Sequence, residues 1–340
     1  MKILLLTRRY SGTDGHSTVM NNVAYALLDK KIKPVIGALN FLQDPPSQIP
    51  KLKLRWPNDI IEFNNSVKEY DLIHNFQTLS SYTSLLTNKP YVFHYLGIGT
   101  SLQGINLKLS RIFTKRSIRK YLVSSAVSAN ELHQLIHVNS DIVPLAIHPS
   151  FFRTDFKPFS RNGNPQLLTV TRMMSYKKNE ELLYGFKKFL TMFPDSHLRI
   201  VGTGPQWDDL QRLVIKLGVS SHVELLGQVQ HSDLLPIYAS CDIFISTSSK
   251  EAFPLPVIES MAVEKPVVIS DIPIHQEIIR ESKAGECYKS GDYEDLVNKL
   301  VMVLNDKFVY ISNAKKYAQK WNLDNLGIKL TQIYDEILRN

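Results

Sequence analysis

Short apolar runs alternate along the chain with segments whose apolar residues recur every three or four positions, and this alternation occurs twice. The first run, Ile3–Thr7, precedes a segment in which Val19, Val23 and Leu27 lie on one side of a helix. Short runs rich in β-branched and other apolar residues predict strands that are buried on both faces. Strands that alternate with helices predict an α/β fold with two doubly wound parallel sheets.

The same pattern assigns the elements of both halves. Predicted strands are Ile3–Thr7, Pro34–Ala38, Leu72–His74, Tyr91–His94 and Leu122–Val127, and then Leu167–Thr171, His197–Val201, Val223–Leu226, Ile243–Ser246 and Pro266–Ile269. Predicted helices are Ser17–Asp29, Asn179–Phe193, Pro205–Leu217, Ser232–Ala239, Leu255–Ala262 and Leu326–Leu338. The segment Pro149–Pro165 has no clean periodicity, which is typical of a linker.

A chain of 340 residues with 44% hydrophobic content can bury the cores of two domains. Its two cysteines, Cys241 and Cys287, have a spacing that fits neither a disulfide framework nor a zinc site. The apolar start of the chain stops at Thr7–Arg9, too soon for a signal peptide or a membrane span. These features predict a cytoplasmic protein of two domains.

Positive charge gathers in the first half. Residues 1–160 hold 19 Lys and Arg against 10 Asp and Glu, whereas residues 161–340 hold 21 against 22. The segment 107–122 has six Lys and Arg and no acid, and as a helix it would place Leu109, Ile112 and Phe113 on one face. Such a helix could rest on anionic lipid at the inner face of a membrane, or pack on the core with a solvated basic face. Because the segment has few interleaved aromatics, nucleic acid is not an expected partner.

Two carboxylates stand out after the predicted strand that ends at Ser246. Glu251 lies in the following loop, and Glu259 lies eight positions later inside the predicted helix. Carboxylates so placed can hold hydroxyl groups at opposite ends of one polyol, while the helix amino terminus between them offers N–H groups to a phosphate. The same spacing also fits two carboxylates that only face solvent.

The stretch Glu-Ala-Phe-Pro-Leu-Pro-Val-Ile-Glu, residues 251–259, closely resembles the donor-site signature of the retaining glycosyltransferases of family GT4. The resemblance implies that Glu259 binds the ribose of a nucleotide sugar and that Glu251 contacts the sugar near its reacting carbon. It also implies that backbone amides around Phe253 and Leu255 hold the diphosphate. Pro254 departs from the family, which usually has glycine there, because proline has no N–H to donate.

Other segments of the second half resemble the same family. The run Val-Thr-Arg-Met-Met-Ser-Tyr-Lys-Lys-Asn, residues 170–179, implies that Arg172 and Lys177 stabilise the leaving diphosphate, with Lys178 as an alternative to Lys177. Gly202, in Gly-Thr-Gly-Pro, and Val229, in Gly-Gln-Val, occupy segments that flank the nucleotide in the family. On their own, these residues also fit surface cations and tight turns.

Two positions of the first half match the family less specifically. His94 stands where the family often has a histidine that contacts the donor sugar, although a histidine at a strand end is also a common structural residue. Gly15 aligns with the second glycine of the family's Gly-Gly loop, and Asp14 replaces the first. At Gly15 we expect a loop that either approaches the diphosphate closely or simply turns.

The resemblance covers nearly the whole chain and is weakest over residues 40–120. It implies a GT-B fold, in which two Rossmann-like domains face a central cleft: an acceptor-binding domain over 1–155, a donor-binding domain over 165–320, and a last helix, 322–340, that packs back on the first. The implied function is retaining transfer of a hexose-type sugar from a nucleoside-diphosphate sugar, such as a UDP-sugar, to a glycan or lipid-linked acceptor in polysaccharide or glycolipid biosynthesis. We expect no metal and no other cofactor.

Two other functions fit parts of the same pattern. A sugar-nucleotide epimerase can share this architecture, and the basic first half also fits a protein that binds a lipid surface or nucleic acid without catalysis.

Overall fold

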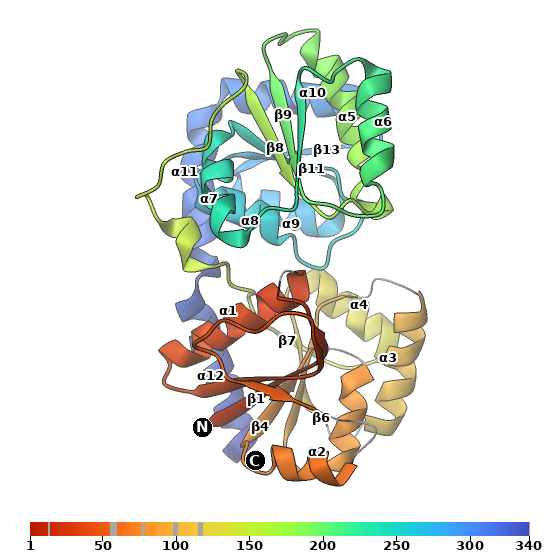
Figure 1. The fold of residues 1–340 in the computed structure, drawn as a ribbon, viewed down its shortest axis with the longest axis vertical. Coiled ribbons are helices and arrows are strands. Elements are labelled where there is room, and N and C mark those ends of the chain that lie inside the picture. The colour runs from red at the N-terminus through yellow and green to blue at the C-terminus, as the bar shows by residue number, and fades with distance from the viewer. Residues whose placement is uncertain (13, 55–59, 77–78, 98–100, 115–117, 340) are drawn as a thin grey trace. The chain divides into compact units, whose positions relative to one another are not determined.

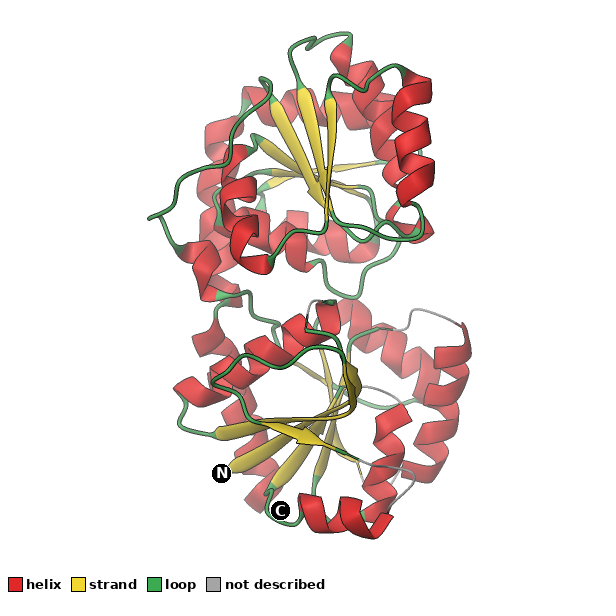
Figure 2. Cartoon of the chain, in the orientation of Figure 1, coloured by secondary structure: helices red, strands yellow, loops and turns green. Residues whose placement is uncertain are grey.

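The computed structural model describes residues 1–12, 14–54, 60–76, 79–97, 101–114 and 118–339. The chain forms two compact units, the first made of Met1–His148 and Trp321–Asn340 and the second of Pro149–Lys320. In each unit a parallel sheet lies between layers of helices (Figures 1 and 2). The predicted α/β fold with two doubly wound sheets is confirmed.

Among its described residues, the first unit has a seven-stranded sheet in the order β3-β2-β1-β4-β5-β6-β7. The strands are β1 (Lys2–Tyr10), β2 (Lys33–Phe41), β3 (Lys51–Lys53), β4 (Leu72–Asn75), β5 (Tyr91–Tyr95), β6 (Ile118–Val123) and β7 (Asp141–Ile142). The helices are α1 (Gly15–Asp29), α2 (Ile60–Val67), the 3₁₀ helix η1 (Leu79–Leu86), α3 (Ser101–Thr114), α4 (Ala126–Ile136) and, from the end of the chain, α12 (Leu323–Arg339).

The second unit has a six-stranded sheet in the order β10-β9-β8-β11-β12-β13. The strands are β8 (Gln166–Val170), β9 (His197–Val201), β10 (Val223–Gly227), β11 (Ile243–Ser246), β12 (Val267–Ser270) and β13 (Gly285–Tyr288). The α-helices are α5 (Asn179–Leu190), α6 (Trp207–Leu217), α7 (His231–Ser240), α8 (Leu255–Ala262), α9 (Pro273–Ser282), α10 (Tyr293–Asn305) and α11 (Lys307–Ala318). Short 3₁₀ helices occur at η2 (Pro149–Phe152), η3 (Ser175–Lys177) and η4 (Gln319–Trp321).

The central strands are apolar because helices cover both faces of each sheet. In β1, the consecutive residues Ile3, Leu4 and Leu5 are all completely buried, although alternate side chains of a strand point to opposite faces. The same holds for Val267 and Val268 in β12. Continuous apolar runs therefore predicted these strands better than an alternating pattern could.

The last helix belongs to the first unit, where it packs against α1. A Cβ atom on Gly327 of α12 would lie 2.7 Å from the carbonyl oxygen of Ala26, so glycine is needed for this close approach. Further along α12, the buried Tyr334 hydroxyl lies 2.6 Å from Nδ1 of His74 in β4. A helix distant in sequence thus completes the core of the first unit.

Two predictions around residues 107–127 are wrong. The helix predicted over 107–122 ends at Thr114, and β6 begins at Ile118, where it pairs in parallel with β5. The strand predicted at Leu122–Val127 therefore starts earlier and ends at Val123. Ser125 then caps α4, because its hydroxyl accepts a hydrogen bond of 3.1 Å from the amide of Ser128.

The helix over 107–122 was predicted from its run of basic residues. Such a run says little about whether part of the segment pairs with a neighbouring strand. Lys115 and the side chain of Phe113, which the predicted basic helix included, lie outside the described residues.

The predicted linker is held against the second unit. The amide of Phe159 donates to the carbonyl of Pro236 at 3.0 Å, and Arg161 pairs with the buried Asp242. Arg199, only 1% exposed, donates to the carbonyl oxygen of Ser160 at 3.0 Å. Buried charges of this kind need such partners, so the linker is part of the structure of the second unit.

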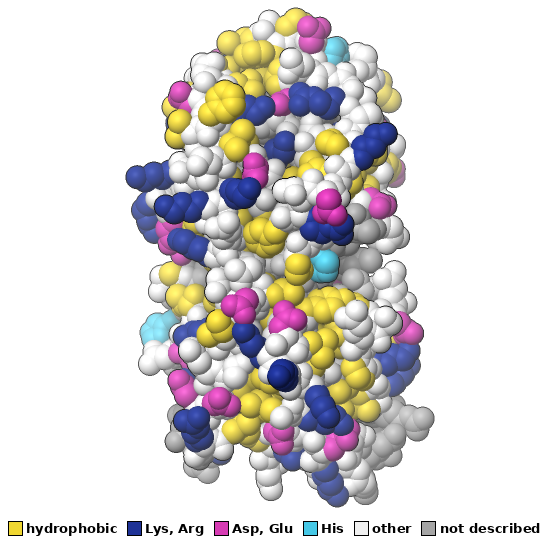
Figure 3. Space-filling model, turned by 90° about the vertical axis from the view of Figure 1, so that its left-hand side faces the viewer, with side chains coloured by type: hydrophobic (Ala, Val, Ile, Leu, Met, Phe, Trp, Pro, Cys, Tyr) yellow, Lys and Arg dark blue, Asp and Glu magenta, His cyan; other side chains and the backbone are white. Residues whose placement is uncertain are grey.

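The surface mixes both signs of charge. On the face drawn in Figure 3, basic side chains stand beside acidic ones on both units. Surface ion pairs such as Lys30 with Asp324 and Lys315 with Glu264 follow the same arrangement. None of the helices in the described ranges combines the length and the apolar character that a membrane span needs.

Candidate functional site

The candidate site lies where three neighbouring strands of the second unit end. Strands β8, β11 and β12 are adjacent and parallel, so their carboxyl ends meet at one edge of the sheet. Loops at this edge of a doubly wound sheet commonly bind ligands. The polar residues of interest follow directly after these strands.

Hydrogen bonds tie the loop after β8 to the loop after β11. The backbone amide of Ser249 donates to the carbonyl oxygen of Tyr176 at 2.7 Å, and its hydroxyl donates to the same oxygen at 2.9 Å. The Thr247 hydroxyl donates to the carbonyl oxygen of Lys177 at 2.8 Å. The two loops are therefore joined by hydrogen bonds at both Tyr176 and Lys177.

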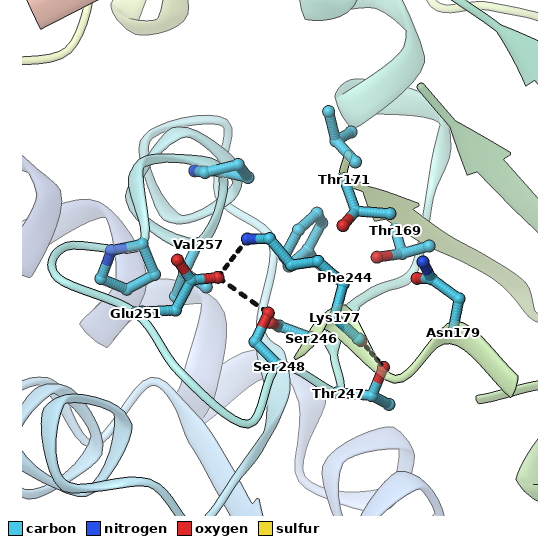
Figure 4. Close-up of a pocket in the computed structure, with 13 residues that line it drawn as sticks. Thr169, Thr171, Lys177, Asn179, Phe244, Ser246, Thr247, Ser248, Glu251 and Val257 are labelled. Atoms are coloured by element: carbon cyan, nitrogen blue, oxygen red, sulfur yellow. Dashed lines mark hydrogen bonds and ion pairs between the residues drawn. The ribbon is translucent and has the colours of Figure 1, made fainter. Parts of the chain in front are cut away.

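An ion pair between Lys177 and Glu251 joins these loops through their side chains (Figure 4). The Lys177 ammonium donates to the Glu251 carboxylate, and the Ser248 hydroxyl donates to the same carboxylate oxygen at 2.8 Å. The two charged side chains are only 12% and 14% exposed. The site thus places a carboxylate and a cation in direct contact with little solvent around them.

A narrow polar pocket surrounds this pair, with a cavity volume of about 10 Å³, which is room for one water molecule or one oxygen of a ligand. Its lining residues are Thr169, Val170, Thr171, Lys177, Asn179, Phe244, Ser246, Thr247, Ser248, Glu251, Pro254, Pro256 and Val257. The Asn179 side chain is buried, and its Nδ2 has no hydrogen-bond partner among the described residues. This amide is a donor that a ligand oxygen could satisfy.

The structure distinguishes the predicted cations. Lys177 reaches the pocket, whereas Lys178 is exposed and has left-handed backbone, with φ of 51°. Arg172 is exposed beside the pocket and donates to the Tyr176 hydroxyl at 2.9 Å. Of the predicted pair, Lys177 is part of the pocket lining and Arg172 lies in the adjoining loop.

The expectation of free N–H groups at the start of α8 is wrong for this structure. The Leu255 amide donates to the carbonyl of Phe253 at 3.1 Å, and the Val257 amide donates to that of Pro254 at 3.0 Å. Pro254 and Pro256 have no N–H. The first turn of α8 therefore offers an anion little beyond its dipole, and side chains must supply the rest.

Glu259 lies on the buried face of α8, only 6% exposed, and it is not one of the residues that line the Glu251 pocket. Its carboxylate accepts a hydrogen bond of 2.8 Å from the hydroxyl of Tyr238 in α7. Burial raises the pKa of Glu259 to about 7, and the hydrogen bond from Tyr238 partly opposes that rise. The two carboxylates of the motif thus occupy different environments.

The glycines after β9 bring two loops together. Gly202 has φ of +118°, and a Cβ atom there would lie 1.8 Å from the carbonyl oxygen of Thr171. Gly204 similarly leaves no room beside Met173. These glycines let the Arg172 loop rest directly on the segment after β9. Val229 is half-buried in the loop between β10 and α7.

In the first unit, His94 is completely buried within β5 and stacks near His74 and Phe76, with ring-centre distances of 5.3 and 5.5 Å. Its Nδ1 lies 3.2 Å from Nε2 of His74, and its own Nε2 has no partner in the described part of the chain. Burial lowers the pKa of His94 to about 3, so the ring is neutral.

Gly15 is the first residue of α1 and not part of a loop, which corrects that prediction. A Cβ atom at Gly15 would meet nothing within 4 Å, so local packing does not require glycine there. Asp14 caps the helix, because its carboxylate accepts a hydrogen bond of 2.7 Å from the amide of Ser17. A carboxylate at this position opposes the binding of another anion.

Several residues of the site had no place in the sequence prediction. Asn179 and Ser248 line the pocket, and behind it lie Ser270, the last residue of β12, and His275 in α9. Ser248 and Ser270 closely follow the predicted strands Ile243–Ser246 and Pro266–Ile269, and Asn179 opens a predicted helix after such a strand, so position at a strand end is the signal that could have found these three. In the part of the chain that the structure describes, no three His, Cys, Asp or Glu side chains gather so as to hold a metal ion.

The Glu259 environment predicts a pH-dependent stability. Between its ordinary pKa of 4.5 and the folded value of about 7, the folded state keeps a proton that the unfolded state has lost. Its contribution to the free energy of unfolding therefore falls by about 2 kcal/mol as the pH rises from 5 to 8. Glu259→Gln should remove this fall, as measured by urea unfolding across the range.

Glu294→Gln, on a side chain that is 76% exposed, is the matched control and should keep the wild-type pH dependence. If both variants follow the wild-type curve, Glu259 does not hold its proton in the folded state.

The chain is similar to curated proteins and to solved structures. It is 24% identical to an N,N'-diacetylbacillosaminyl-diphospho-undecaprenol alpha-1,3-N-acetylgalactosaminyltransferase of Campylobacter jejuni over 71% of this chain and 64% of that protein. It is 29% identical to the sulfoquinovosyl transferase SQD2 of Arabidopsis thaliana over 54% of this chain and 35% of that protein. The chain thus spans less than two thirds of either relative.

Among solved structures, HepE of Anabaena in complex with UDP superposes with a TM-score of 0.82, covering 99% of this chain and 100% of that one at 18% identity. WaaG, a glycosyltransferase involved in lipopolysaccharide biosynthesis, gives 0.74 at 15% identity, covering 98% of this chain and 99% of that one. At these identities the likeness shows the fold, which is the GT-B fold that the resemblance implied.

The family model for glycosyl transferases group 1 matches residues 151–321, half of the chain and nearly all of the second unit. This range contains β8, β11 and β12 with the Lys177–Glu251 pocket between their ends. The chain belongs to the glycosyl transferases group 1 family.

Proposed function

We propose that this protein is a retaining glycosyltransferase of the GT4 type, which transfers a hexose-type sugar from a nucleoside-diphosphate sugar to a glycan or lipid-linked acceptor. The observation that carries the proposal is the pocket in which Lys177 meets Glu251 at the carboxyl edge of the second sheet. A sugar nucleotide needs a cation for its diphosphate and, beside it, a hydrogen-bond acceptor for the hydroxyls of its sugar. In this pocket Lys177 is the cation and Glu251 is the acceptor.

In the proposed reaction, the bond between the anomeric carbon and the diphosphate oxygen breaks, and the acceptor hydroxyl oxygen bonds to the same face of that carbon. The acceptor proton passes to the departing phosphate. Negative charge grows on the diphosphate as the bond breaks, so cations that meet it there lower the barrier. Lys177 and Arg172 take this role, and Glu251 orients the sugar through its hydroxyls.

The remaining donor contacts follow the family resemblance. Glu259 binds the ribose, the segments at Gly202 and Val229 flank the nucleotide, and the loop at Phe253 and Leu255 lies beside the diphosphate. We propose that the first unit binds the acceptor, and His94 and Gly15 are the residues of that unit that the family resemblance gives as donor contacts. Because the amides at the start of α8 are engaged, we expect side chains, and Lys177 above all, to dominate the contact with the diphosphate.

A UDP-sugar is the proposed donor. Structures of the similar Anabaena HepE contain UDP, or UDP-glucose. A lipid-linked acceptor is supported by the Campylobacter jejuni relative, whose name specifies a diphospho-undecaprenol acceptor.

The first test is a thermal-shift panel of UDP, GDP, ADP and their common sugar conjugates. A nucleotide present at 100 times its dissociation constant adds about 2.7 kcal/mol of stability. We expect uridine nucleotides to stabilise the protein and the others to have little effect. Product analysis with the stabilising conjugate then separates transfer from epimerisation. Absence of any shift at millimolar ligand would overturn the proposal.

A second prediction concerns the ion pair itself. In the free protein the Glu251 carboxylate competes with a diphosphate for Lys177. Glu251→Gln keeps an acceptor oxygen but removes the competing charge, so UDP should bind about tenfold more tightly, a change of about 1.4 kcal/mol. Transfer should become slower, because the variant lacks the Glu251 carboxylate that orients the sugar.

Isothermal titration with UDP measures the first effect, and Lys177→Met, which removes the cation, should weaken UDP binding. Weaker UDP binding by Glu251→Gln would show that the carboxylate does not compete for Lys177.

We also propose that helix α3 of the protein rests on an anionic membrane. Lipid-linked acceptors reside in such a membrane. Ile105, Leu109 and Ile112 recur at helical spacing on its outer face and are 56%, 45% and 70% exposed. The neighbouring Lys108 is exposed as well. Arg111 is not on this face, since it packs over the ring of Tyr121 at 5.9 Å. Exposed apolar residues beside a basic one fit an interfacial helix.

Sedimentation with vesicles tests this surface. We expect binding to vesicles rich in phosphatidylglycerol, weak binding to phosphatidylcholine, and about tenfold weaker binding for Ile112→Ser, because less apolar surface enters the lipid. Ile215→Ser alters a residue that is equally exposed, at 72%, but lies on α6, so it should bind as the wild type does. Equal effects of both substitutions would exclude α3 as the specific contact.

A further inference from the structure

A line of hydrogen bonds runs from Glu251 to a buried histidine behind the pocket. The Ser248 hydroxyl donates to the Glu251 carboxylate at 2.8 Å, and the Ser248 carbonyl accepts from the Ser270 hydroxyl at 2.6 Å. The Ser270 hydroxyl oxygen in turn lies 2.9 Å from Nδ1 of His275. His275 is completely buried in the first turns of α9. The line connects the ends of two neighbouring strands, β11 and β12.

The direction of each hydrogen bond follows from the partners. Because the Ser270 hydroxyl donates its proton to a carbonyl, it can only accept from His275. The ring Nδ1 also lies 3.1 Å from the carbonyl oxygen of Ser270, which likewise only accepts. His275 is therefore the tautomer with its proton on Nδ1. Its Nε2 has no partner in the described ranges, so the ring acts through Nδ1 alone.

The His275 ring keeps one protonation state at neutral pH. Burial lowers the pKa of His275 to about 4, although the nearby Glu251 partly opposes that change. The neutral tautomer thus persists at neutral pH, and the line of hydrogen bonds keeps one direction.

Ser248 is the link on which the position of Glu251 depends. Its hydroxyl holds the carboxylate while its carbonyl is held from the opposite side by Ser270. Glu251 has two donors at one carboxylate oxygen, Lys177 and Ser248. When a diphosphate draws Lys177 away, Ser248 is the donor that remains.

We propose that His275 is a positioning residue for Glu251, holding the carboxylate in place through Ser270 and Ser248 when Lys177 turns to the donor diphosphate. This inference rests on the proposed glycosyl transfer. In this arrangement His275 touches neither the sugar nor the phosphate. It restricts the loop after β11, and this loop carries Glu251, which contacts the sugar. A shift of the carboxylate by about 1 Å is enough to slow a reaction up to about 100-fold.

Two substitutions of similar character separate the donor role from packing. In His275→Asn, the side-chain amide N–H takes the place of Nδ1–H, whereas in His275→Gln the amide reaches the place of Nε2. We expect His275→Asn to keep kcat within about threefold of wild type and His275→Gln to lower it ten- to 100-fold. UDP affinity, by titration, should be the same in both, because both variants keep Lys177 and Glu251 and because UDP lacks the hexose that Glu251 orients.

Melting temperatures of both variants establish that they fold. Equal kcat for the two variants, or a parallel loss of UDP affinity in His275→Gln, overturns the positioning role and leaves His275 as a packing residue. Failure of the underlying function looks different: the wild type itself then neither binds a nucleotide nor transfers a sugar.

Discussion

Removing a carboxylate from water costs free energy unless an opposite charge and hydrogen-bond donors accompany it. Glu251 meets this requirement with Lys177 from the loop after β8 and Ser248 from its own loop. The need for these partners also constrains the two loops that carry Lys177 and Glu251. Both loops must hold fixed positions, and their backbones are bonded to each other at Tyr176 and Ser249. The pocket exists because two strands far apart in sequence end side by side.

The same pair sets a chemical condition on the ligand. A cation already paired with a carboxylate is not available to a phosphate without an exchange of partners. In the proposed reaction, such an exchange would make binding weaker, but it would free the Glu251 carboxylate for the sugar when the diphosphate binds Lys177. The engaged amides and two prolines at the start of α8 leave this exchange to side chains. In the proposed reaction, Lys177 would thereby link recognition of the diphosphate to orientation of the sugar.

Buried polar groups organise the first unit as well. His74 connects Tyr334 of the last helix to His94 of β5, and all three side chains are buried. These hydrogen bonds, together with the close contact at Gly327, explain why α12 completes the first unit after the chain has built the second. In both units, loops and helices distant in sequence are fixed by a few satisfied polar groups and not by apolar contact alone.

The sequence by itself determined the two-sheet α/β fold, the helix that carries Glu259, and the loop positions of Lys177 and Glu251. Apolar runs and helical spacing are local properties, and they decide these features. The tertiary structure decided that Lys177 rather than Lys178 meets Glu251. It also decided that Glu259 is buried and does not line that pocket. The contact between Lys177 and Glu251 depends on which strand ends become neighbours, and the burial of Glu259 depends on the elements that pack against α8. No local pattern of residues encodes either property.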